Sequence, residues 1–351
     1  MTAMYSVLHM FVDGVCAYAM FGTFLKQEQG YFYVLIYNFC AFALQMPFGA
    51  ALDLLHAKSG KQFSFVVAGM GVALTFAGAV THPVILGIGN ALFHVCGGVG
   101  TIFEDERKNR RGRGLGVFVA PGALGLYFGM LLAKNGAGAG WLYGAGVFMA
   151  LVCVGAACRL WRGGRQPVAT QDVPSGGAIP LAACLFLVVV LRSYIGMAVT
   201  FPWKTTVFAA ALSTLAIVLG KAAGGFLAAQ FGGLRTAVVS LSAAAVFYLF
   251  SGFMPAGVAA LFLFNMTMPV TLYLLVRRLP RLPGFSFGLL TFGLFLGFLP
   301  EYYGLRIWQN SSMIGCVGSV ISLLILAAGI FRGNPDIDSE AVSSRSVKSS
   351  K

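Results

Sequence analysis

The chain has 351 residues, of which 58% are hydrophobic and only 10% are charged, whereas soluble domains carry about 25% charged residues. This balance excludes an ordinary soluble domain, because a fold of this size could not bury so much apolar surface. The net charge of +13 comes from basic residues in short segments between apolar runs, so no basic domain exists that could bind nucleic acid.

Twelve apolar runs follow one another along the chain. Each is roughly 18–24 residues long, the length that a helix needs to cross about 30 Å of hydrocarbon. The alternation of polar and apolar residues that marks an outer-membrane β-barrel is absent. The predicted spans are 2–24, 31–54, 63–80, 83–102, 114–133, 140–160, 179–200, 204–228, 234–253, 256–277, 284–300 and 308–331.

The longest polar interruption, 161–178, contains two prolines and several glycines and separates six predicted spans from six. We therefore expect an all-α, polytopic membrane helix bundle with twelve transmembrane helices in two pseudo-symmetric six-helix halves, 1–160 and 179–331. Residues 161–178 are expected to form a cytoplasmic linker. The Ser-rich polar tail, 332–351, is expected to be disordered and cytoplasmic.

The basic residues predict the orientation in the membrane. If the N-terminus is cytoplasmic, eighteen of the 24 Lys and Arg residues fall in cytoplasmic loops and ends, and four fall outside. The remaining two, Arg192 and Lys221, lie within spans. Because membrane proteins concentrate positive charge on the cytoplasmic side, we expect a multi-pass protein of the plasma (inner) membrane with both termini cytoplasmic.

Several polar side chains are predicted to lie deep in the hydrocarbon. His9 and Asp13 are four residues apart in the first span and share one helix face, and Asn90 and His94 repeat this spacing in the fourth. The other two are Arg192 in the seventh span and Asn265 in the tenth. A charged residue at mid-bilayer costs about 2.5–3.5 kcal/mol on insertion scales, so these residues are candidates for function.

A short motif occurs twice, near the ends of the second and eighth spans. The first copy reads Gly49-Ala-Ala-Leu-Asp53. The second begins at Gly225 and contains Gly232 and Arg235. The two leading glycines are 225 − 49 = 176 positions apart, about half the chain. A repeated loop motif in a six-plus-six arrangement is typical of duplicated transporters.

This arrangement resembles the major facilitator superfamily, whose loop after the second span has Gly, then Asp four residues later, then Gly and basic residues. The second copy departs from that pattern, with Ala229 in place of the acid, and the first has Leu54 and Leu55 where small polar or basic residues are usual. The resemblance implies that Gly49, Asp53, Gly225 and Arg235 help to close a cytoplasmic gate.

Within that superfamily the chain is most similar to fosmidomycin-resistance-type exporters. The similar stretches are Gly87-Ile-Gly-Asn-Ala-Leu-Phe93-His94, the His9 and Asp13 pair, and Arg192-Ser193-Tyr194, although the group's Pro after the Phe-His is Val95 here. The resemblance implies export, and a central cavity lined by spans one, four, seven and ten. Those four spans carry the deep polar residues.

We therefore predict a secondary active transporter of a small solute that works as a monomer by alternating access, coupled to protons. Asp13 would carry the proton, with His9 adjusting its proton affinity and Arg192 competing for the carboxylate. Asn90, His94 and Asn265 would shape the substrate site. The chain has no P-loop to use ATP, and no GxSxG, HExxH or metal-spaced Cys/His motif, so we expect no enzymatic activity, no cofactor and no metal site.

Other interpretations remain open for these residues. His9 and Asp13 could be a packing pair, His94 could donate to a backbone carbonyl, Arg192 could be a structural counter-ion, and Asn265 could satisfy a helix break near Pro269. The alternative functions are a membrane-embedded enzyme acting on lipid-linked substrates, with His9, Asp13 and His94 as acid and base, and a non-transporting receptor or assembly factor. A polar cluster at the midplane favours transport, whereas one at an interface favours the enzyme.

Overall fold

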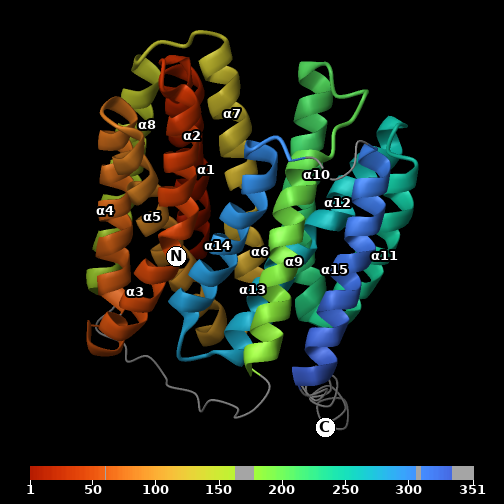
Figure 1. The fold of residues 1–351 in the computed structure, drawn as a ribbon. Helices are drawn as coiled ribbons and strands as arrows, with labels where there is room; N and C mark the ends of the chain where they lie inside the picture. The colour runs from red at the N-terminus through yellow and green to blue at the C-terminus, as the bar shows by residue number, and fades with distance from the viewer. Residues whose placement is uncertain (60, 163–177, 306–309, 334–351) are drawn as a thin grey trace. The chain divides into compact units, whose positions relative to one another are not determined.

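The computed structural model describes residues 1–351 apart from residues 60, 163–177, 306–309 and 334–351. Helices account for the regular structure in these residues (Figure 1). They are α1 (Thr2–Gly22), η1 (Phe24–Lys26), α2 (Gly30–Asn38), η2 (Phe39–Ala43), α3 (Gln45–Ser59), α4 (Lys61–Val80), α5 (Pro83–Arg107), α6 (Arg113–Val119), α7 (Gly122–Lys134), α8 (Gly140–Arg162), α9 (Ala178–Ala198), α10 (Val207–Phe231), α11 (Gly233–Leu249), α12 (Met254–Asn265), α13 (Thr267–Arg278), α14 (Pro283–Tyr302) and α15 (Ser311–Gly333).

These helices, some of which form one span together, account for all twelve predicted spans. Among the described residues, 11 helical segments are long and apolar enough to cross a membrane. The shorter apolar helix α11, with 17 residues, lies at the predicted ninth span. The prediction of an all-helical, twelve-span membrane bundle is therefore confirmed.

Three of the spans are built from more than one helical segment. A π-helical turn, η2, separates α2 from α3, and breaks after Val119 and Asn265 separate α6 from α7 and α12 from α13. Proline removes a helical hydrogen bond, and Pro121 and Pro269 lie within three residues of the two breaks. These interruptions free backbone carbonyls inside the membrane, which other groups must then satisfy.

The fourth span continues beyond its predicted end at residue 102. Helix α5 runs to Arg107 and buries Glu104. The Glu104 carboxylate lies 2.5 Å from Lys108 Nζ and 3.3 Å from the N-terminal amine of Met1. These partners compensate the buried charge, so the helix does not need to end where the apolar run ends. Most of the predicted linker, 161–178, and tail, 332–351, lies outside the described residues.

The described chain forms two compact units. The first contains the described parts of Met1–Arg110, Val117–Gln171 and Arg281–Phe295, and the second those of Arg111–Gly116, Asp172–Pro280 and Leu296–Lys351. The start of α6 thus packs with helices of the C-terminal half, and the start of α14 with helices of the N-terminal half. The predicted division into two pseudo-symmetric halves stays a prediction.

Glycines let helices of the first unit approach closely. A Cβ built on Gly125 of α7 would lie 2.0 Å from the Met10 carbonyl oxygen of α1, and one built on Gly129 would lie 2.2 Å from the Gly14 carbonyl oxygen. No larger residue fits at such a backbone contact. This packing, typical of small residues in membrane helices, holds the start of α7 against the middle of α1.

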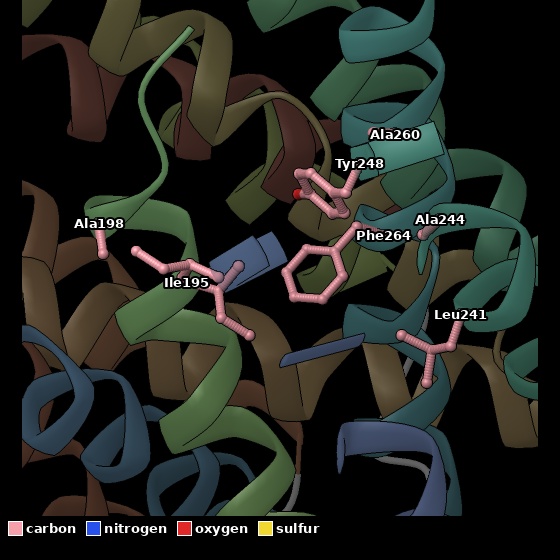
Figure 2. Packing of buried hydrophobic residues seen from close by; sticks show 8 residues of the cluster. Ile195, Ala198, Leu241, Ala244, Tyr248, Ala260 and Phe264 are labelled. Carbon is pink, nitrogen blue, oxygen red and sulfur yellow. The ribbon is translucent and has the colours of Figure 1, made fainter. Parts of the chain in front are cut away.

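The second unit has an apolar core where α9, α11, α12 and α15 meet (Figure 2). The rings of Tyr248 and Phe264 lie 5.7 Å apart at 80°, an edge-to-face contact. Figure 2 shows Ile195 of α9 beside this pair. Arg192 lies one turn before Ile195 on the same helix, so the core fixes the helix that carries this buried arginine.

Candidate functional site

Helices α1 and α5 bring four polar side chains into one cluster, which we call the carboxylate cluster: His9, Asp13, Asn90 and His94. His9 Nε2 lies 3.1 Å from Asp13 Oδ2, and His94 Nε2 lies 3.4 Å from Asp13 Oδ1. Asn90 Nδ2 donates to Asp13 Oδ1 at 3.3 Å and also lies 3.4 Å from the Cys16 sulfur. The other three predicted residues of these two helices thus surround the Asp13 carboxylate.

The carboxylate cluster is buried near the middle of both helices. Asp13 is 8% exposed and His9 6%. Asp13 is the twelfth residue of the 21 in α1, and His94 is the twelfth of the 25 in α5. At 1.5 Å per residue both are about 17 Å from the start of their helix, which is close to the midplane of about 30 Å of hydrocarbon.

Backbone carbonyls set the protonation of both imidazole rings. His9 Nδ1 lies 2.7 Å from the Phe118 carbonyl oxygen, and His94 Nδ1 lies 2.8 Å from the Asn90 carbonyl oxygen. Because a carbonyl oxygen only accepts hydrogen bonds, both Nδ1 atoms must carry the donated proton. The Phe118 carbonyl is available because the fifth span breaks before Pro121. In a neutral ring, the Nε2 that faces Asp13 is then an acceptor.

Three acceptors therefore meet at the carboxylate cluster. With neutral rings and an ionised carboxyl group, the lone pairs of two Nε2 atoms face the oxygens of Asp13. Buried acceptors that face each other without a hydrogen or a cation between them are costly. A proton on either Nε2 or on the carboxyl group removes one repulsion, and a cation held between the three groups removes both. The geometry thus favours cation binding at this point.

Gly122 packs directly against this cluster. A Cβ built on Gly122, the first residue of α7, would lie 2.4 Å from both Asp13 Oδ2 and His9 Nε2. Any side chain at position 122 would therefore intrude between the carboxylate and the imidazole. Three ligand-bearing residues, His9, Asp13 and His94, place their ligand atoms within 4.8 Å of one another, a group that could hold a metal ion.

The predicted site residues of the second unit have different surroundings. Arg192 of α9 is 9% exposed, and its Nε has no hydrogen-bond partner among the described residues. Asn265 ends α12 and donates to the Leu261 carbonyl oxygen at 2.9 Å. This bond lies within α12, and the role of Asn265 in the substrate site stays a prediction.

No family model and no curated protein sequence matches the chain. Solved structures do match over nearly its whole length. The Escherichia coli fucose:proton symporter is 12% identical, with a TM-score of 0.59, and the match covers 93% of this chain and 97% of that one. A human organic anion transporter is 15% identical, with a TM-score of 0.62 over 93% and 99% of the two chains.

A bacterial homologue of the iron transporter ferroportin, in an outward-facing state, is 14% identical, with a TM-score of 0.60 over 94% of this chain and 99% of that one. The chain has the major facilitator transporter fold. At these identities the likeness shows the fold alone, and the similarity to fosmidomycin-resistance-type exporters stays a prediction.

The first copy of the repeated motif joins two helices of this facilitator fold within the first unit. Asp53 Oδ1 and Oδ2 accept hydrogen bonds from the backbone amides of Gly284 and Phe285, both at 2.8 Å. These amides lie in the first turn of α14, where helical amides have no partner in their own helix and the helix dipole favours an anion. A Cβ on Gly49 would lie 2.0 Å from the Gly284 carbonyl oxygen.

The second copy of the motif lies in the second unit of the facilitator fold and lacks the carboxylate. A Cβ on Gly225 of α10 would lie 2.8 Å from the Gly116 Cα of α6. Gly232 links α10 to α11 with a φ of 92°, a conformation that favours glycine. Arg235 is exposed near the start of α11. Only the first copy therefore combines a glycine contact with a capping carboxylate.

Two parts of the carboxylate cluster were not predicted, the Phe118 carbonyl and the close approach of Gly122. Neither is a functional side chain, so a search for polar residues in the spans could not find them. The signal that was present is the Pro121-Gly122 pair in the middle of the fifth span. A proline there predicts a free carbonyl one turn earlier, and the glycine predicts a close approach.

Proposed function

We propose that this facilitator-fold protein is a proton-coupled secondary transporter of a small solute, working as a monomer by alternating access. The observation that carries the proposal is the contact of His9 Nε2 and His94 Nε2 with the two oxygens of the buried Asp13 carboxyl group, about 17 Å from the start of α1. Such a cluster is stable only with a bound proton or other cation, and transporter sites lie at this depth. Asp13 with His9 carries the proton, and Asn90 and His94 contact the solute.

The other proposed roles follow from the helices that carry the residues. Arg192 is a buried cation that takes part in coupling, and Asn265 shapes the substrate site. The contact between α3 and α14 at Gly49 and Asp53, with its counterpart at Gly225 and Arg235, forms the gate. Both termini lie in the cytoplasm of a cell whose plasma membrane holds the protein. The direction of transport, proposed as export, rests only on the similarity to fosmidomycin-resistance-type exporters.

The rival function, an enzyme acting on lipid-linked substrates, is less well supported. Head groups lie at the membrane interface, whereas the carboxylate cluster is about 17 Å from the start of each helix. Solved structures that match include a fucose:proton symporter, an organic anion transporter and a homologue of an iron transporter. Since one fold serves such different solutes, the solute has to be argued from the site.

Asp13→Asn tests the proposal, because it keeps the size of the side chain and removes its charge. Purified protein is placed in liposomes with a pH-sensitive dye inside, and members of a solute library are added with and without a pH gradient. We expect the parent to move protons with at least one solute. We expect Asp13→Asn to fold and insert normally but to lose gradient-driven transport.

Glu28→Gln is the control, because Glu28 is an exposed carboxylate outside the carboxylate cluster. It should behave like the parent. If Asp13→Asn accumulates solute against a gradient as well as the parent does, Asp13 is structural, and His94 becomes the next candidate for coupling.

A further inference from the structure

We propose that His9, Asp13 and His94 form a binding site for a divalent transition-metal ion, and that this ion is a solute that the protein carries. The binding site stands on its own geometry. Only the carriage of the ion rests on the proposed function. The three ligand atoms would be Nε2 of each histidine and a carboxylate oxygen of Asp13.

The ligand atoms of His9, Asp13 and His94 lie near enough to one another for a shared metal ion. Histidine nitrogens bind such ions at about 2.0–2.1 Å and carboxylate oxygens at about 2.0–2.2 Å. Two ligands in a tetrahedral or octahedral arrangement are therefore about 2.8–3.5 Å apart. Asp13 Oδ2 lies 3.1 Å from His9 Nε2, and Asp13 Oδ1 lies 3.4 Å from His94 Nε2. One ligand atom from each residue lies within 4.8 Å of the others, so the side chains have to move closer together to bind one ion.

The groups behind the ligands have the arrangement of a metal site. A metal-binding histidine usually donates its other ring nitrogen to a carbonyl or carboxylate, which fixes its tautomer and aims its lone pair at the ion. Both histidines do so, His9 to the Phe118 carbonyl and His94 to the Asn90 carbonyl. The Asn90 amide also holds the Asp13 carboxylate. A packing pair would not require two histidines oriented alike around one carboxylate.

Gly122 lets the backbone of α7 lie directly against two of the ligands, because a Cβ there would be 2.4 Å from both Asp13 Oδ2 and His9 Nε2. A methyl group at this position would displace both ligand atoms. Two imidazoles with one carboxylate favour Zn²⁺, Co²⁺, Fe²⁺ or Ni²⁺ over Mg²⁺ and Ca²⁺, which prefer oxygen ligands. Because the protein supplies only three ligands, further coordination positions of the ion stay open to water. An ion that is partly hydrated in this way can leave the site, as carriage requires.

The test uses Co²⁺ as the probe, with the full chain purified in detergent. Titration calorimetry and the visible absorption of Co²⁺ report stoichiometry and ligand type. We expect one Co²⁺ per chain and no competition from excess Mg²⁺. We expect His94→Gln and Asp13→Asn to weaken binding more than about 100-fold, because loss of outer partners alone costs about 10–100-fold. Gly122→Ala should weaken it with all three ligands present.

His82→Ala is the matched control, since His82 is an exposed histidine at the start of α5 and should leave Co²⁺ binding unchanged. Each variant is compared only when its thermal unfolding and elution match the parent's. If Gly122→Ala fails to fold, His94→Gln decides. Absence of Co²⁺ binding to the parent, or equal binding by His94→Gln, would overturn the site.

Carriage is tested separately in liposomes that contain a Co²⁺-sensitive dye. Uptake of Co²⁺ by the parent, lost in His94→Gln and kept in His82→Ala, supports the whole inference. Binding in detergent without movement in liposomes overturns the carriage of the ion. Proton movement with another library solute would then still support the proposed function, so the two failures are distinguishable.

Discussion

Gly49 of α3 and Gly284 of α14 meet at a backbone contact, where a Cβ on Gly49 would lie 2.0 Å from the Gly284 carbonyl oxygen. Gly225 of α10 makes the corresponding contact in the second unit, with Gly116 of α6. The leading glycine of each motif copy therefore allows a close backbone contact between two helices. In each case the second span of one predicted half contacts the start of the fifth span of the other predicted half.

The first prediction concerns this contact. Gly49→Ala should lower the unfolding temperature or slow transport, because the new methyl group has to push two backbones apart, and overpacking costs about 1–3 kcal/mol. The measurement is thermal unfolding of the purified protein, together with transport in liposomes. Gly69→Ala in α4 is the control, since a Cβ there meets nothing within 4 Å. Equal effects of the two substitutions would contradict the contact.

The second prediction concerns the cap on α14. Asp53→Ala removes the acceptor for the Gly284 and Phe285 amides. We expect a loss of about 1–3 kcal/mol, the usual range for hydrogen bonds to a charged group. Asp53→Asn keeps one oxygen and should fall between the parent and Asp53→Ala in unfolding temperature. A substitution series with no such order would show that the cap does not stabilise the start of α14.

The twelve-span architecture was predictable because it depends only on run length and apolarity, which the sequence states directly. The end of the fourth span was not predictable, because Glu104 is paired with the N-terminal amine of Met1, a contact between residues about a hundred positions apart. The breaks in the fifth and tenth spans had a local cue in Pro121 and Pro269. The π-helical turn at Phe39–Ala43 had a similar cue in Pro47, which cannot donate a hydrogen bond to the Ala43 carbonyl.

The residues of the carboxylate cluster were predictable from the sequence, but their assembly into one cluster was not. Helical spacing placed His9 with Asp13 and Asn90 with His94, since residues four apart share a face. That the two pairs surround one carboxylate depends on how α1 packs against α5, which no spacing along the chain specifies. The metal-capable geometry was missed for the same reason, because its ligands come from two spans and are 81 to 85 positions apart across them.

The third prediction concerns Arg192. Replacing a buried charge by a hydrophobic residue of similar length is often neutral or stabilising. Arg192→Met should therefore keep or raise the unfolding temperature, while transport is lost. Arg192→Lys keeps the positive charge but lacks the planar guanidinium group. Transport by this variant would show that the charge is sufficient, and loss of transport would show that the guanidinium group is needed. A large fall in the unfolding temperature of Arg192→Met would mean that the arginine is structural, and normal transport would exclude it from coupling.

The last prediction separates the two nitrogens of His9. Nδ1 donates to the Phe118 carbonyl, whereas Nε2 faces Asp13. The amide nitrogen of an asparagine occupies nearly the position of Nδ1, so His9→Asn should keep the first contact and lose the second. His9→Ala loses both and leaves a buried carbonyl without its donor, at a cost of about 1–3 kcal/mol.

The unfolding temperature should therefore fall clearly for His9→Ala and little for His9→Asn, measured on purified protein in the same detergent. Gradient-driven transport and Co²⁺ binding should be impaired in both variants, because both lack the nitrogen that faces the carboxylate. If the two variants unfold at the same temperature, the contact with Phe118 contributes nothing to stability. If His9→Asn transports and binds Co²⁺ like the parent, Nε2 is not part of the site, and His9 serves only to hold the fifth span.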